Sequence, residues 1–244
     1  RNAVLSAQIA KKGLKGFDEP LEGKLGFYHA YARDNVDYER IVEKLGEKYY
    51  AGTLYFKLWP SCAGTHPAIQ TVQKLADEYQ ITADEIKEIH VITSERNRML
   101  VEPEEIRKAP DTSIAGKFSI PYTSAVALIK GNVTLDDFQE KALHDETVRS
   151  LAGKFTHDVN TDWGKREGMN TDITIKTMKG DYHSFYTEVG KASEMPTFEK
   201  LTEKMKACAQ HAWIKKSVCE MDILVQMVQK IEDLENIHRL TALL

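Results

Sequence analysis

The stretch FKLWPSCAGTHPAI, residues 56–69, joins a strand-like run to a helix-like run. Residues 51–56 (AGTLYF) are apolar and predict a short strand. Residues 67–79 predict a helix, because apolar side chains recur there at helical spacing: Ile69, Val72, Leu75 and Ala76. Thr65 stands where an N-cap is expected, and Pro67 lies in the first turn, where its missing N–H costs nothing. We therefore expect a strand, a tight loop and a helix N-terminus in this order.

The loop concentrates reactive side chains at that helix N-terminus. The first N–H groups of a helix lack partners and favour an anion such as a carboxylate. Lys57 would add a positive charge, and His66 could transfer a proton. Two interpretations are open at this point. Lys57, Cys62 and His66 belong to a carboxylate-binding site, or they are a surface lysine, a packed cysteine and a histidine at the helix entry.

Four stretches together resemble the MmgE/PrpD family, which includes 2-methylcitrate dehydratase and cis-aconitate decarboxylase. Residues 56–69 resemble the signature of the family's lid domain, and residues 1–32 (RNAVLSAQIAKKGLKGFDEPLEGKLGFYHAYA) resemble its last core helix and exit. Residues 115–131 (AGKFSIPYTSAVALIKG) resemble a buried helix of the lid, and residues 230–244 (KIEDLENIHRLTALL) the family's C-terminus. Their order and spacing carry the resemblance across nearly the whole chain.

The resemblance implies a reaction without metal or nucleotide: loss of water or of a carboxylate from a small di- or tricarboxylate. Lys57 then becomes a substrate-carboxylate ligand, and Met99 and Tyr122 become substrate-facing candidates on neighbouring elements. Cys62 and His66 become the catalytic candidates. Cys62 occupies a position resembling a histidine of cis-aconitate decarboxylase and a cysteine of many other members, which counts against that decarboxylase. A Cys62–His66 nucleophile and base pair is the chemical alternative.

The fold class predicted from these patterns is α+β, with a small, mostly antiparallel sheet and helices on one face. Residues 51–190 form the lid domain in this interpretation. Residues 1–50 and 191–244 are helical, and by resemblance both belong to an all-helical domain. The chain opens at Arg1 within a helical pattern and is shorter than the family's members. We therefore expect the C-terminal part of a longer polypeptide, lacking an N-terminal helical domain, inactive and prone to associate when alone.

Individual elements follow from local patterns. Strands are predicted from about residue 87 to 93, after a capping-box pattern at 82–85, and at 155–159. Residues 172–178 and 183–189 predict a hairpin around Lys179-Gly180-Asp181. Residues 113–129 predict a helix that Pro121 kinks or breaks. Further helices are expected at these places: 2–12, 144–154, 198–213 and, after a second capping box at 217–220, up to about 234.

Composition excludes several classes of protein. The 244 residues are 42% hydrophobic and 29% charged, with a net charge of −4, which argues against a nucleic-acid partner. No apolar run approaches a membrane span. Three cysteines without framework spacing indicate reduced thiols and a cytoplasmic or similar compartment. The resemblance to the MmgE/PrpD family also implies a homodimer. The open functional alternatives to a lyase are an isomerase or epimerase of the same family and a non-catalytic ligand-binding or interaction module.

Overall fold

The computed structural model describes residues 1–33, 35–54, 56–187 and 196–243. The chain divides into two compact units, Arg1–Leu54 and Tyr55–Leu244. No helix of the described residues is long and apolar enough to cross a membrane. The expected boundary at residue 190 lies outside the described residues. The assignment of both helical ends to one domain stays a prediction.

The first unit contains short helices and no buried hydrophobic side chain among its described residues. Its helices are α1 (Asn2–Lys11), α2 (Phe27–Ala32) and α3 (Tyr38–Val42). Gly13 follows α1 with a φ of 98°, a conformation that favours glycine just beyond a helix end. The predicted strand at 51–56 is wrong. Tyr50–Thr53 is a 3₁₀ turn, and the N–H of Leu54 bonds locally to the carbonyl of Ala51 rather than to a neighbouring strand.

A four-stranded sheet organises the second unit, in the order β2-β1-β3-β4. Its strands are β1 (Ile86–Ser94), β2 (Phe155–Asn160), β3 (Thr171–Thr177) and β4 (Asp181–Tyr186). β1 pairs parallel with β2 and antiparallel with β3, and β3 pairs antiparallel with β4. The predicted α+β class with a mostly antiparallel sheet is confirmed, as is the β3–β4 hairpin.

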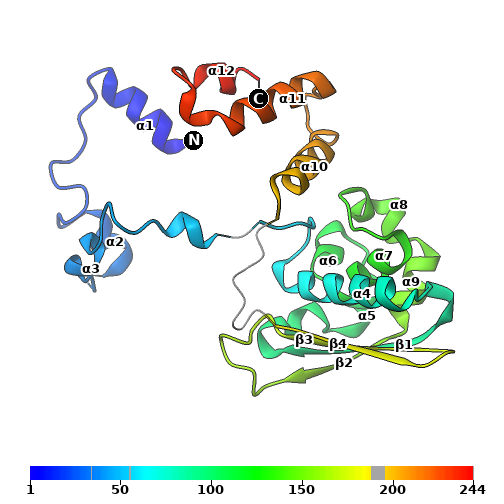
Figure 1. The fold of residues 1–244 in the computed structure, drawn as a ribbon. Coiled ribbons are helices and arrows are strands. Elements are labelled where there is room, and N and C mark those ends of the chain that lie inside the picture. Colours follow the sequence, from blue (N-terminus) through cyan, green and yellow to red (C-terminus); the bar gives the residue numbers. More distant parts are fainter. Residues whose placement is uncertain (34, 55, 188–195, 244) are drawn as a thin grey trace. The chain divides into compact units, whose positions relative to one another are not determined.

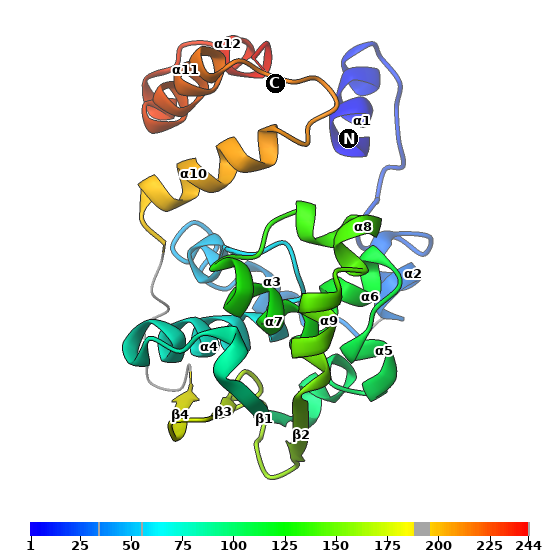
Figure 2. The ribbon, with the colours of Figure 1, turned by 90° about the vertical axis from the view of Figure 1, so that its right-hand side faces the viewer.

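Helices cover one face of this sheet (Figures 1 and 2). They are α4 (His66–Tyr79), α5 (Glu104–Lys108), α6 (Ser113–Lys117), α7 (Ile120–Lys130), α8 (Glu140–Leu143) and α9 (Glu146–Gly153). The predicted helix at 113–129 is indeed broken in two. Ser119 caps α7 by accepting a hydrogen bond from the N–H of Tyr122, and Pro121 lies in the first turn.

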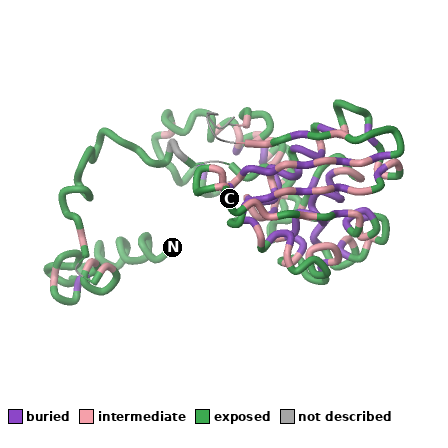
Figure 3. The backbone as a smooth tube through the Cα atoms, turned by 90° about the horizontal axis from the view of Figure 1, so that it is seen from below, coloured by how far each residue is buried: buried purple, intermediate pink, exposed green. Residues whose placement is uncertain are grey.

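The hydrophobic core lies between that sheet face and the helices, where the buried residues of Figure 3 are concentrated. Ile89, Val91, Ile173 and Ile175 contribute from the strands, and each is fully buried. β1 follows the 3₁₀ turn Ala83–Glu85, so the capping-box pattern at 82–85 precedes a strand and the expected strand start is confirmed.

Three C-terminal helices complete the second unit: α10 (Phe198–Ala209), α11 (Val218–Gln229) and α12 (His238–Thr241). The capping box at the start of α11 is confirmed, since Ser217 and Glu220 satisfy each other's backbone N–H groups. Met221, Leu224 and Leu240 form a small separate cluster there.

Candidate functional site

The loop before α4 is held by contacts with distant parts of the second unit. The indole N–H of Trp59 donates a hydrogen bond of 3.0 Å to Asn132, just after α7. The N–H of Cys62 donates one of 2.8 Å to the carbonyl of Lys117, the last residue of α6. Trp59 itself is only 9% exposed. The loop is therefore fixed to the helical layer at both anchors.

Gly64 provides a third anchor, against the 3₁₀ segment η4 (Glu95–Leu100) that follows β1. A Cβ at Gly64 would lie 2.4 Å from Oδ1 of Asn97 and 2.5 Å from a methyl group of Leu100. Both neighbours are buried, and the Asn97 amide donates to the carbonyl of Gly168. Only glycine fits this close approach.

The hydroxyl of Thr65 is used inside the loop rather than as a helix cap. It donates to the carbonyl of Cys62 at 2.8 Å and lies 2.7 Å from the hydroxyl of Ser61. Thr65 does occupy the N-cap position of α4, as predicted, but its side chain accepts nothing from the first helical turn. The N–H of His66 already bonds to the carbonyl of Ala63, and Pro67 has no N–H, so this helix start offers an anion mainly the positive end of the helix dipole.

Lys57 and His66 are electrostatically coupled at this helix start. The ammonium group of Lys57 donates a hydrogen bond of 3.1 Å to the carbonyl of Ser61. Burial, and next the charge of Lys57, lower the pKa of His66 to about 4. Its Nε2 is buried and has no hydrogen-bond partner among the described residues. His66 is therefore a neutral imidazole at neutral pH, with one ring nitrogen unsatisfied.

The candidate residues predicted from the sequence lie on three elements: Lys57, Cys62, His66, Met99 and Tyr122. Lys57, Cys62 and His66 share the loop and the start of α4, and Cys62 is a partly buried free thiol. Met99 lies on η4, the element that contacts Gly64, and is 53% exposed. It lines a surface hollow of about 640 Å³ together with residues of its own segment: Glu95, Arg96, Arg98, Glu102 and Pro103.

Tyr122 lies in the protein interior. Its side chain is fully buried, and its hydroxyl donates to the backbone carbonyls of Asp137 and Ala142. Burial, and then the charge of Asp137, raise the pKa of Tyr122 well above its ordinary value. The hydroxyl is thus engaged with the segment between α7 and α9. A substrate-binding role for Tyr122 stays a prediction.

A second cleft, of about 550 Å³, lies between residues 58–60 of the loop and α10. Its lining includes Trp59, Pro60, Asn132, Lys200, Lys204 and His211. Lys204 also acts on His66, as a smaller cause of its lowered pKa. Sequence reasoning missed Lys204 and Asn132. Gly131, which ends α7, marks a helix end next to Asn132 in the sequence. Nothing in the sequence indicated that Asn132 accepts a hydrogen bond from Trp59.

The arrangement combines a cation, a helix N-terminus and a neutral imidazole within one rigid loop. Such a set can hold a carboxylate and exchange a proton with a bound molecule. Among the described residues, no group of three or more His, Cys, Asp or Glu side chains is placed to hold a metal ion.

Comparison with known proteins assigns the family. The chain is 24% identical over 259 residues to the cis-aconitate decarboxylase-like protein oryM of Aspergillus oryzae (strain ATCC 42149 / RIB 40), covering 100% of this chain and 52% of that protein. It is 24% identical over 253 residues to the cis-aconitate decarboxylase of Aspergillus terreus, covering 96% and 51%. The chain thus spans about half the length of the curated relatives it matches. Residues 59–231 match the MmgE/PrpD C-terminal domain, and the chain therefore belongs to the MmgE/PrpD family.

Proposed function

We propose that this chain supplies the Lys57–His66 part of the active site of a lyase that acts on a small di- or tricarboxylate. Membership of the family and the decarboxylase names of its relatives support a lyase. The observation that carries the proposal is the start of α4, where the charge of Lys57 acts on a neutral His66 whose Nε2 has no hydrogen-bond partner among the described residues.

In this proposal Lys57 and the N-terminus of α4 bind one substrate carboxylate. Both supply positive potential, and a charge-assisted hydrogen bond is about twice as strong as a neutral one. The helix end and the ammonium group also stabilise charge that develops on the substrate during bond breaking.

His66 acts as the proton carrier of the loop. A neutral imidazole can take a proton from a carbon next to a carboxylate, while the hydroxyl group of the substrate leaves as water after accepting a proton. In a decarboxylation, the electron pair of the broken C–C bond stays on the substrate, which then accepts a proton as CO₂ departs. The proposal assigns Cys62 a position beside the reacting groups, where a partly buried thiol shapes the site.

Within the lyase class we propose dehydration of 2-methylcitrate before decarboxylation of cis-aconitate. The cysteine at position 62 supports this order, because the resemblance associates a histidine there with the decarboxylase. An isomerase or epimerase of the same family would use the same carboxylate site without losing water or CO₂.

The test is an assay of the protein containing this chain with 2-methylcitrate and with cis-aconitate, followed by proton NMR and CO₂ measurement. A new alkene signal from 2-methylcitrate without CO₂ is the expected result. CO₂ from cis-aconitate would reverse the proposed order. Binding of either acid without any chemical change would refute the lyase and favour a ligand-binding module.

A further inference from the structure

The cleft between residues 58–60 and α10, which we call the α10 cleft, has two unlike walls. Its volume of about 550 Å³ is typical of a small-molecule binding site. One wall comes from the loop and from the segment after α7 and is mainly apolar: Leu58, Trp59, Pro60, Val133 and Leu135. The other wall is α10 and carries most of the charges. A molecule with an apolar body and one charged group would complement both walls.

The α10 wall is one face of that helix. Lys200, Lys204 and Ala207 line the cleft and follow one another at helical spacing, so they lie on the same side. Another face of α10 is turned to α11, where Lys206 pairs with Asp222 at 2.6 Å. The lysines of the cleft are therefore not the ones that hold α10 on its neighbouring helix.

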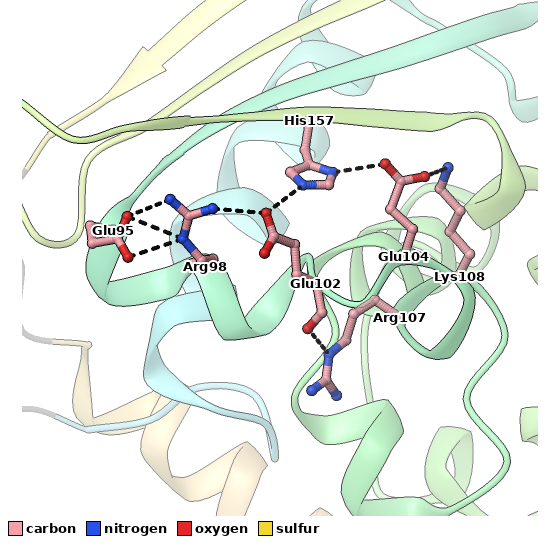
Figure 4. A network of polar contacts seen from close by, with 7 residues as sticks. All are labelled: Glu95, Arg98, Glu102, Glu104, Arg107, Lys108 and His157. Carbon is pink, nitrogen blue, oxygen red and sulfur yellow. Dashed lines mark hydrogen bonds and ion pairs between the residues drawn. The ribbon is translucent and has the colours of Figure 1, made fainter.

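These two lysines lack a counter-ion in the part of the chain that the structure describes. Figure 4 shows the contrasting arrangement in the segment after β1, where two cations each contact a carboxylate: Arg98 and Lys108. No described carboxylate lies within ion-pair distance of Lys200 or Lys204. The cleft thus contains two positive charges that are free to meet an anion.

The acidic side chains of the cleft are placed differently from Lys204. Asp136 is exposed and faces His211, whose Nε2 lies 3.7 Å from its Oδ1. Glu203 is exposed on α10, where water solvates its charge. Lys204 is partly buried, and its charge reaches His66, whose pKa it helps to lower. An ammonium group that is partly withdrawn from water without a counter-ion favours binding of an anion.

We propose that the α10 cleft binds a small amphipathic carboxylate, with its carboxylate at Lys204 and its apolar body against Trp59 and Pro60. Lys200, one turn earlier on the same face, adds positive potential. The site goes beyond the lyase reaction and does not depend on it. Because the charge of Lys204 also acts on His66, a bound anion couples the cleft to the loop of the candidate site.

Isothermal titration calorimetry of the protein containing this chain tests the site with matched probes, benzoate and benzamide. The two molecules have the same ring and nearly the same shape, but only benzoate is charged. At low ionic strength benzoate should bind at least about tenfold more tightly, since a charge-assisted hydrogen bond separates the two. Equal affinity for both probes, or no binding of benzoate, would overturn the proposal.

Acetate tests the apolar wall, because it keeps the carboxylate and lacks the ring. It should bind more weakly than benzoate by about tenfold or more, as expected for the loss of buried apolar surface. An affinity for acetate equal to that for benzoate would contradict the proposed place of the apolar body beside Trp59.

Lys204→Gln is the decisive variant, because glutamine keeps the helix propensity and removes the charge. Benzoate binding should weaken about 10- to 100-fold, while benzamide binding should not change. Lys206→Gln is the matched control: it makes the same change on the face turned to α11 and should bind benzoate as the wild type does. Unchanged benzoate binding in Lys204→Gln would refute the site.

Ala207→Phe tests the cleft itself without altering its charge. The new ring would occupy space between α10 and the loop, so binding of benzoate should be lost. Undiminished binding in this variant would place benzoate outside the α10 cleft and overturn the proposal.

NMR titration of the His66 ring measures the coupling to the candidate site. Benzenesulfonate is the probe, because it stays ionised near pH 4, where His66 titrates. It should raise the pKa of His66 in the wild type but not in Lys204→Gln, whose His66 pKa is already higher because the lysine charge is absent. An equal His66 pKa in Lys204→Gln and wild type would show that Lys204 does not lie near the loop, and would overturn the site. None of these measurements uses turnover, so a failure of the proposed function would leave them unaffected.

Discussion

The indole of Trp59 stands edge-on to the imidazole of His66, with ring centroids 5.1 Å apart and planes at 82°. This contact places the apolar indole beside His66, the first residue of α4, whose pKa is lowered to about 4. Because the indole N–H of Trp59 donates to Asn132, the ring cannot move away from His66 without breaking that hydrogen bond. His66 is partly buried beside this indole, and burial is the largest cause of the lowered pKa that keeps it uncharged near neutral pH.

The first prediction concerns the pH dependence of stability. Folded His66 binds a proton only near pH 4, whereas an unfolded histidine does so near pH 6.5. As pH falls through this window the unfolded state takes up the proton first, so the free energy of unfolding decreases. Between about pH 7.5 and about pH 5 the loss due to His66 is about 2 kcal/mol.

Urea denaturation at these two pH values measures this loss. In His66→Gln, which does not titrate, the drop in the free energy of unfolding should be smaller than in the wild type by about 2 kcal/mol. His238→Gln is the control, since His238 is exposed on α12, and it should drop as the wild type does. An identical drop in wild type and His66→Gln would show that His66 is not held neutral by folding.

The second prediction concerns Lys57. Lys57→Ala should reduce kcat/KM for the carboxylate substrate about 10- to 100-fold, as expected for one charge-assisted contact of about 1.5–3 kcal/mol. The stability should change little, because Lys57 is exposed and its hydrogen bond goes to a single loop carbonyl. Lys57→Arg keeps the charge and should lose less activity.

Lys57→Ala should also raise the pKa of His66, because the lysine charge is the second cause of its depression. The rise is partial, since burial is the larger cause and remains. NMR titration of the His66 ring measures it. Lys87→Ala, at an exposed position of β1, is the matched control and should alter neither kcat/KM nor the pKa of His66. Unfolding of Lys57→Ala with normal kinetics in the folded fraction would make Lys57 structural.

The sequence was informative where the signal is local. The periodicity of residues 67–79 predicted α4 within one residue of its observed start, and Pro121 predicted the break between α6 and α7. The hairpin was predicted because Lys179 and Gly180 supply the turn between two alternating runs. The strand expected at 51–56 failed because an apolar run forms a strand only when another strand pairs with it.

Long-range pairing was beyond sequence reasoning. β1 pairs with β2 across about sixty residues that form helices in between, and no local pattern indicates which strands become neighbours. The same holds for the site. Lys57, Cys62 and His66 were identified together because they share one loop. Their supports at Asn97, Lys117 and Asn132 come from distant segments and required the structure.

The third prediction concerns the close approach at Gly64. Gly64→Ala places a methyl group within 2.5 Å of Asn97 and Leu100, which are buried and cannot move freely. Overpacking of this kind costs about 1–3 kcal/mol, so the midpoint of urea denaturation should fall. Gly153→Ala is the control. Open space surrounds Gly153 at the end of α9, so alanine there should be neutral or slightly stabilising. A wild-type midpoint for Gly64→Ala would mean that η4 yields easily and does not fix the loop.

The last prediction separates a structural from a substrate-binding role for Tyr122. Tyr122→Phe removes the hydroxyl that donates to the carbonyls of Asp137 and Ala142 and leaves these acceptors buried without that donor. The free energy of unfolding should therefore fall by about 1–3 kcal/mol.

If the hydroxyl serves only the core, kcat and KM of the folded variant stay at wild-type values. Tyr79→Phe is the control, because Tyr79 is 45% exposed and the loss of its hydroxyl should change stability by less than about 0.5 kcal/mol. A raised KM in Tyr122→Phe without loss of stability would instead place the Tyr122 hydroxyl at the substrate. The buried position of the ring argues for the first result, since a hydroxyl that already donates to two carbonyls has no second proton for a ligand.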